Sequence, residues 1–254
     1  MSPGEALAIF AAGLAAGTVN TIVGSGSLIT FPTLLAFGYA PVVANVTNTV
    51  GLVPGSLSGA YGYRRELAGQ RSRLVTLGLV SAAGGLTGGV LLLVLPGSVF
   101  RTIVPVLILL ACTLVALQPR LARRLARRRA EAPEKSHAHG GPGLLVTVYL
   151  TGVYGGYFGA AQGVILIALL GIFIDDDLQR LNAAKNVLAA LVNGVAALLF
   201  MVASHVAWSA AGVLAVGAIL GGLAGATVGR RLPGPLLRGI IVVVGTAVAI
   251  RLLV

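Results

Sequence analysis

The chain has 254 residues, of which 57% are hydrophobic and only 10% are charged, and its mean hydropathy is +0.96. A soluble domain carries about 25% charged residues, so this composition excludes a globule whose surface faces water. The net charge of +11 is compatible with nucleic-acid binding, but the arginines flank apolar segments, as the positive-inside rule of membrane proteins describes. We therefore expect an all-α, polytopic membrane protein without a nucleic-acid partner.

Nine apolar stretches follow one another along the chain. They lie at about residues 5–23, 27–38, 43–63, 73–95, 99–118, 143–172, 181–203, 208–229 and 235–253. A helix needs about 20 apolar residues to cross a bilayer, so the stretches predict about eight transmembrane helices joined by short loops. The first stretch has no cationic flank of the kind that precedes a cleaved signal peptide, and we expect it to remain in the membrane.

The first two stretches predict a broken helix. Residues 5–38 would extend about 50 Å as one straight helix, which is longer than a bilayer is thick. Their middle reads Gly24-Ser25-Gly26-Ser27, and Pro32 follows. Glycine and proline in succession interrupt a helix. We predict a helix, a short extended break and a half-helix that ends near Gly38.

A basic segment divides the chain. Residues 119–142 read PRLARRLARRRAEAPEKSHAHGGP and predict a cytoplasmic linker between a first transmembrane repeat, residues 1–118, and a second, residues 143–254. The arginines fit either a short amphipathic helix on anionic lipids or a solvated loop. His137 and His139 have no nearby histidine or cysteine that would complete a metal site, so we expect no metal and no cofactor.

The two halves repeat each other at an offset of about 138 residues. Gly13-x-x-x-Gly17 matches Gly152-x-x-x-Gly156, and the break at residues 24–28 falls opposite residues 161–165. Thr47-Asn48 falls opposite Lys185-Asn186. An internal duplication with broken helices at equivalent places is typical of secondary transporters. Whether the repeats are parallel or inverted stays open, because eight simple crossings would put Arg230 and Arg231 on the outside.

Polar residues interrupt the apolar stretches near both breaks and predict a binding site for a small anion. A broken helix leaves backbone N–H groups unpaired where its second half starts, and this helix end carries partial positive charge. Glycines allow a ligand to approach the backbone, and side-chain hydroxyls and amides add donors. The predicted substrate-binding residues are Asn20, Gly24, Ser25, Gly26, Ser27, Thr47, Asn48, Gln162, Gly163, Lys185, Asn186 and Asn193. Asn45 and Asn182 also interrupt these stretches.

Each of these features also has a purely structural interpretation. Small residues at the first break could simply allow close helix packing, and for Gly84–Gly89 and Gly221–Gly225 packing is the favoured interpretation. Lys185 could contact the anion, extend to the lipid headgroups, or pair with the aspartates at residues 175–177. Those aspartates fit a solvated loop and a helix start.

The stretch Gly13–Pro32, GLAAGTVNTIVGSGSLITFP, followed by Ala44-Asn45-Val46-Thr47-Asn48, resembles the first-repeat signature of the sulfite exporter TauE/SafE family. Residues 152–163, with Ala184-Lys185-Asn186 and Asn193, are similar to the second. Residues 160–164, AAQGV, differ from the family's Gly-Pro-Gly-Thr-Gly-Ser-like run. The resemblance implies a multi-pass permease of the inner (plasma) membrane. Its relatives export sulfite, sulfoacetate and related organosulfur anions, or take up small carboxylates or other sulfur compounds.

Other functional classes fit the sequence less well. An intramembrane enzyme would need a motif such as His-Glu-x-x-His or Gly-x-Ser-x-Gly, and neither occurs, so we expect no enzymatic activity. An anion channel or a non-transporting assembly subunit remains as an alternative. No carboxylate falls in the middle of a predicted span, which favours passive or weakly coupled efflux. The glycine-rich face at Gly217–Gly229 could pack against a second copy of the chain.

Overall fold

The computed structural model describes residues 1–131, 141–227, 239, 242–243, 246 and 249–250. These residues form nine α-helices, which confirms the all-α class for the part of the chain described. The helices are α1 (Pro3–Ile22), α2 (Ser27–Ala36), α3 (Pro41–Gly62), α4 (Arg71–Val94), α5 (Gly97–Glu131), α6 (Gly141–Tyr157), α7 (Gln162–Phe173), α8 (Leu178–Ala203) and α9 (Trp208–Thr227).

The helices confirm a polytopic membrane protein. Within the described ranges, five segments are long and apolar enough to cross a membrane by length and composition: α1, α4, the Gly97–Leu117 part of α5, α8 and α9. The helices α2 and α7 are apolar but shorter. Most of the last predicted stretch, 235–253, lies outside the residues that the structure describes, as do Arg230 and Arg231.

The predicted linker is partly helical. Helix α5 passes the expected boundary at residue 118, contains Pro119 and ends at Glu131. Residues 119–131 are therefore helical, but they continue α5 and do not form a separate short helix. Residues 132–140, with His137 and His139, lie outside the described residues, and residues 141 and 142 belong to α6. Contact between this segment and anionic lipid stays a prediction.

Both helix breaks are present, and the second lies earlier in the chain than the sequence indicates. Helix α1 ends at Ile22 and α2 begins at Ser27, as predicted. The second break covers residues 158–161, so Gln162 and Gly163 are the first residues of α7 and not part of the break. The reason lies in the backbone: Gly159 has φ +76° and Ala161 has φ +59°, and a right-handed helix cannot contain such residues.

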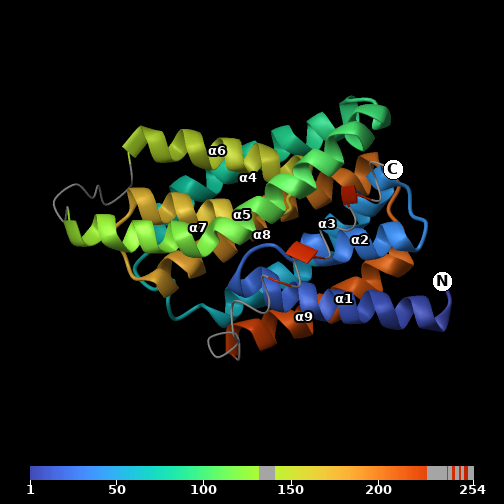
Figure 1. Ribbon diagram of the computed structural model, residues 1–254, viewed down its shortest axis with the longest axis horizontal. Coiled ribbons are helices and arrows are strands. Elements are labelled where there is room, and N and C mark those ends of the chain that lie inside the picture. Colours follow the sequence, from blue (N-terminus) through green and yellow to red (C-terminus); the bar gives the residue numbers. More distant parts are fainter. Residues whose placement is uncertain (132–140, 228–238, 240–241, 244–245, 247–248, 251–254) are drawn as a thin grey trace.

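The short helices turn back along the long ones. The Tyr39 hydroxyl, which follows α2, donates to Glu5 Oε1 near the start of α1 at 3.1 Å, so α2 returns toward the level at which α1 began. In Figure 1, α1 begins at the right of the view and α6 begins at the left. The two broken helices therefore enter the molecule from opposite ends.

Glycines hold the outer helices together. Helix α1 packs on α9 and α6 packs on α4, and the two pairs lie at opposite edges of the molecule (Figure 1). A Cβ at Gly17 would overlap the carbonyl oxygen of Ala218, and one at Gly156 would overlap that of Gly85. Cβ atoms at Gly84 and Gly221 would likewise overlap the carbonyl oxygens of Tyr149 and Leu14, which confirms packing for the glycines of α4 and α9. Contact with a second copy of the chain stays a prediction.

The centre of the molecule contains α3 and α8, which contact each other. Helix α3 also packs on α9, and α8 packs on α4, so each central helix connects to one outer pair. Phe31 of α2 and Phe158 of the second break pack edge to face with ring centroids 5.3 Å apart. These contacts bring α2 and the second break together in the buried centre.

An ion-paired latch joins the α3–α4 and α7–α8 loops. Asp176 lies 2.8 Å from Arg73 and 2.7 Å from Arg180, and Arg180 also donates to the carbonyl oxygen of Ala68 at 3.0 Å. Asp177 caps α8 by accepting from the backbone N–H of Gln179, which confirms the predicted helix start. No sequence pattern predicts the pairing between Asp176 and Arg73.

The latch predicts acid-sensitive stability. Burial alone would raise the pKa of Asp176, but hydrogen bonds from Arg73, the Asp177 backbone and Arg180 outweigh burial and lower the pKa. Because the pKa of Asp176 is lower in the folded state, its ion pairs stabilise the fold at pH values above about 4, the pKa of an unfolded carboxyl group. This stabilisation is lost as the pH falls through the pKa of the folded state. Asp176→Asn should cost about 1–2 kcal/mol at pH 7. The melting temperatures of the parent protein and the variant, measured in detergent, should converge as the pH falls toward 3. A difference in melting temperature that stays constant with pH would contradict the role of these ion pairs.

Candidate functional site

The first helix break meets the start of α7, directly after the second break, in the centre of the molecule. The backbone N–H of Gly163 donates to the carbonyl oxygen of Gly24 at 3.0 Å. A Cβ on Gly163 would lie 2.5 Å from the Cα of Gly24, so only glycine fits on either side. The Gly163 N–H is consequently bonded within the protein, and any anion at this place has to use other donors.

Buried side chains without a partner lie next to this contact in the chain. Ser25 follows Gly24 and is 1% exposed, and Gln162 precedes Gly163 and is 2% exposed. Among the side chains that the structure describes, Ser25 Oγ and Gln162 Nε2 are buried without a hydrogen-bond partner, as are Tyr157 Oη, Asn45 Oδ1 and, in α4, Ser81 Oγ. Apart from Asn45 Oδ1 these groups can donate, and an unpaired buried donor is costly. The arrangement therefore suits a ligand rich in acceptors.

Lys185 lies inside the protein at the end of α1. Its side chain is 1% exposed, and Nζ donates to the carbonyl oxygens of Asn20 and Thr21, each at 3.2 Å. The last carbonyls of a helix lack partners within the helix and carry partial negative charge, so the ammonium neutralises this end of α1. Extension to the headgroups and pairing with the aspartates are therefore both wrong. Contact with an anion stays a prediction.

Two asparagines of α8 reinforce this cap. Asn182 and Asn186 donate to the carbonyl oxygen of Thr21 at 3.2 and 3.3 Å. In the other half, Asn45 of α3 donates to the carbonyl oxygen of Tyr157 at the end of α6, at 3.0 Å. Each broken helix is therefore capped by amides from the central helix of the opposite half.

Asn48 positions the start of α2. Its Nδ2 donates to Ser27 Oγ at 3.2 Å, and its Oδ1 accepts from the hydroxyl of Thr30. Ser27 is the first residue of α2, so this network fixes a hydroxyl at the positive end of the half-helix.

The remaining predicted site residues lie against other groups of the protein. Asn20 Nδ2 donates to Ser56 Oγ at 3.4 Å, and Thr47 Oγ1 accepts from the backbone N–H of Ala207 in the α8–α9 loop at 3.1 Å. Gly26 packs closely against the carbonyl oxygen of Ala16. Asn193 is half-buried, and its Oδ1 would lie 3.9 Å from a Cβ on Gly159. A substrate contact by any of these residues stays a prediction.

The predicted set of ligands does not include Asn45 and Asn182. Each stands three or four residues before a predicted ligand on the same helix, Asn48 or Asn186, and such residues share one helix face. That spacing was the available signal. It places the side chains beside one another, but it does not reveal that they cap the opposite half's broken helix.

Comparisons with known proteins identify related membrane transporters. Residues 9–252 match the family model described as sulfite exporter TauE/SafE. The chain is 28% identical over 246 residues to the probable membrane transporter protein YfcA of Escherichia coli K12, covering 96% of this chain and 88% of that protein. It is 27% identical over 252 residues to the probable membrane transporter protein ORF9 of a Sinorhizobium species, covering 96% and 91%. No solved structure matches the chain significantly.

Proposed function

The chain belongs to the sulfite exporter TauE/SafE family, and we propose that it exports small sulfur oxyanions or organosulfur anions, such as sulfite, sulfoacetate or related sulfonates. It is a membrane transporter by family and not an enzyme. The proposal places it in a bacterial-type inner membrane, with the anion bound where the two helix breaks meet, near the midplane.

The observation that carries the proposal is the pair of unpartnered donors beside the Gly24–Gly163 contact. Ser25 Oγ and Gln162 Nε2 are buried without an acceptor in the described protein. Leaving a buried donor unpaired costs about 1–3 kcal/mol, and an oxyanion supplies several acceptor oxygens at once. A small carboxylate would satisfy the same donors, which makes it the second candidate substrate.

The helix arrangement supports an inverted duplication. Helices α1 and α6 start from opposite ends of the molecule (Figure 1), and α1 packs on α9 as α6 packs on α4. Exchanging the two halves therefore exchanges equivalent contacts. In transporters with such repeats, one bundle moves against the other around a fixed central site. This mechanism exposes the meeting point of the breaks to each side of the membrane in turn.

The basic end of the molecule supports an orientation. Arg64, Arg65, Arg71 and Arg73 lie at the end where α3 and α4 join, beside the α7–α8 loop. By the positive-inside rule this end faces the cytoplasm. An inside-negative potential of 100 mV then drives a monovalent anion outward with about 2.3 kcal/mol, so export needs no coupling ion.

Transport in proteoliposomes with an imposed membrane potential tests the function. Sulfite, sulfoacetate, taurine and acetate are compared as substrates, with and without a pH or Na⁺ gradient. We expect voltage-dependent flux of the sulfur oxyanions that no cation gradient alters. Flux of acetate alone would favour the carboxylate permease, and absence of flux for all anionic solutes would contradict the proposal.

The hydroxyl of Ser25 provides a selective prediction. Ser25→Ala should lower sulfite flux about tenfold, since one hydrogen bond to a charged ligand is worth about 1.5 kcal/mol or more, while the fold loses no protein hydrogen bond. Ser81→Ala is the matched control, because Ser81 Oγ is equally buried and unpartnered but lies in α4, outside the breaks. Equal flux in the Ser25 variant and in the control would remove Ser25 from the site.

A further inference from the structure

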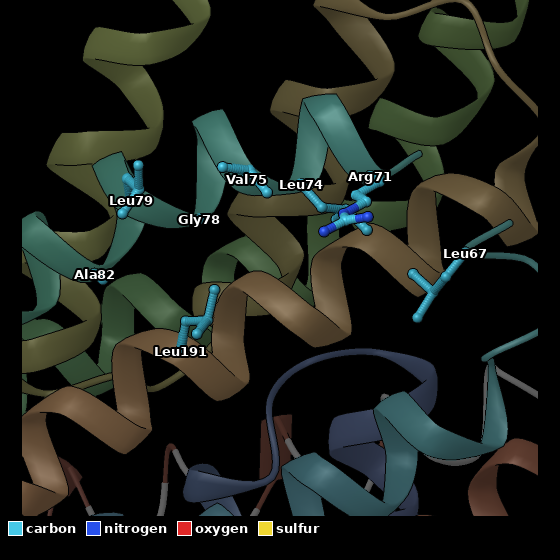
Figure 2. A pocket seen from close by; sticks show the side chains of 8 residues that line it. All are labelled: Leu67, Arg71, Leu74, Val75, Gly78, Leu79, Ala82 and Leu191. Atoms are coloured by element: carbon cyan, nitrogen blue, oxygen red, sulfur yellow. The ribbon is translucent and has the colours of Figure 1, made fainter. Parts of the chain in front are cut away.

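A groove runs along the outer side of α4, between α4 and α8. Its volume is about 450 Å³, and it is lined by Leu67, Arg71, Leu74, Val75, Gly78, Leu79, Ala82 and Leu191 (Figure 2). Gly78 lets Leu191 of α8 pack directly against the backbone of α4, where a Cβ would lie only 2.9 Å from Leu191 Cδ1. The groove lies beside this contact.

The groove opens toward lipid. Val75 is 55% exposed and Leu79 is 69% exposed, and both belong to α4, one of the helices long and apolar enough to span the membrane. In a multi-pass membrane protein, apolar side chains exposed on such a helix face hydrocarbon or another apolar surface. Apart from Arg71, every residue that lines the groove is apolar or glycine.

The length of the groove matches the acyl-chain thickness of one membrane leaflet, and its charged end lies where a lipid headgroup would be. Figure 2 shows Arg71 toward one end and Ala82 at the other. These two positions are eleven residues apart on α4, which corresponds to a rise of about 16.5 Å, close to half of a ~30 Å hydrocarbon core. Arg71 is the first residue of the helix, so its guanidinium lies where a headgroup would be when the acyl chain follows the groove.

The charge of Arg71 is available for a ligand. Arg73 is ion-paired with Asp176, and Arg64 stacks on the ring of Tyr61 at 4.5 Å. Arg71 is exposed, and the described part of the chain holds no carboxylate within ion-pair distance of it. A guanidinium binds a phosphate through two parallel hydrogen bonds. A basic position at the cytoplasmic end of an intramembrane groove is a recurrent feature of anionic lipid sites.

We propose that this groove binds one acyl chain of an anionic phospholipid, with the lipid phosphate paired to Arg71. The site is separate from the basic segment 119–131 and does not depend on which substrate is transported. In this proposal the lipid contacts α4 and α8. These helices run from the ion pairs of Asp176 to the centre of the molecule. A change of lipid composition therefore acts on the packing of these two helices.

The test is photo-crosslinking with lipid analogues in nanodiscs. Phosphatidylglycerol and phosphatidylcholine with the same diazirine-labelled acyl chain are compared, and crosslinked peptides are mapped by mass spectrometry. We expect the phosphatidylglycerol analogue to label residues 74–82 of α4 more strongly than the phosphatidylcholine analogue. Arg71→Gln should lower this labelling about fivefold and leave labelling elsewhere on the chain unchanged. Arg64→Gln, in the same loop region but outside the groove, is the matched control.

A second variant distinguishes a lipid in the groove from a protein partner in the groove. Ala82→Phe fills the deep end of the groove and should reduce labelling of α4 by both analogues without changing the mass of the complex. If both lipid analogues label α4 equally, or if Arg71→Gln has no effect, the anionic-lipid site is refuted. If Ala82→Phe instead splits an oligomer and leaves labelling intact, the groove is a subunit interface and the proposal is overturned.

Discussion

Replacing Gly163 with alanine should abolish transport and reduce the yield of folded protein. The new Cβ would lie 2.5 Å from the Cα of Gly24, which is backbone and cannot rotate away as a flexible side chain can. Overpacking of this kind costs about 3 kcal/mol or more when the backbone has to shift. The shift would also break the 3.0 Å hydrogen bond from Gly163 to Gly24, so the two breaks would separate.

Gly194→Ala is the control for this variant. Gly194 lies within α8, and a Cβ there meets no atom within 4 Å. Because alanine favours a helix over glycine by about 1 kcal/mol, this variant should be as stable as the parent or slightly more stable. Monodispersity in size-exclusion chromatography and sulfite flux measure both variants. Wild-type flux from Gly163→Ala would show that the close contact between the breaks is not required.

Lys185→Met should destabilise the protein more than any single change to the asparagines beside it. The ammonium bonds two carbonyl oxygens at the buried end of α1, and a hydrogen bond to a charged group is worth about 1.5–3 kcal/mol. We expect a loss of about 3 kcal/mol, corresponding to a fall in Tm of roughly 6–12 °C for a protein of this size. Asn186→Leu should cost about 1 kcal/mol, because Thr21 keeps its bond from Lys185.

The same variant distinguishes a capping role from substrate contact. If the ammonium also binds the anion, Lys185→Met lowers the flux of sulfite relative to that of acetate in the protein that remains folded. Unchanged selectivity together with a lowered Tm would assign Lys185 to the cap alone. An unchanged Tm would contradict the cap that the hydrogen bonds describe.

The first break and the membrane class could be predicted because their signals are local. Apolar stretches predict spanning helices, and Gly24 and Gly26 mark the interruption directly. The sequence predicts the second break about three residues too late, since Ala161 adopts a left-handed backbone that the identity of an alanine does not indicate. The partners of Lys185 were unpredictable for a different reason: they are backbone carbonyls, which every residue possesses.

The packing of α1 on α9 has a consequence for biogenesis. Thr18 donates to the carbonyl oxygen of Gly221, a residue 203 positions further along the chain. At about 5–20 residues per second, a ribosome finishes this partner roughly 10–40 s after the first helix. During that interval the small-residue face of α1 lacks its native neighbour and requires lipid or the insertion machinery as a substitute. A nascent chain truncated ahead of α9 therefore presents the same unfinished surface to quality-control proteases.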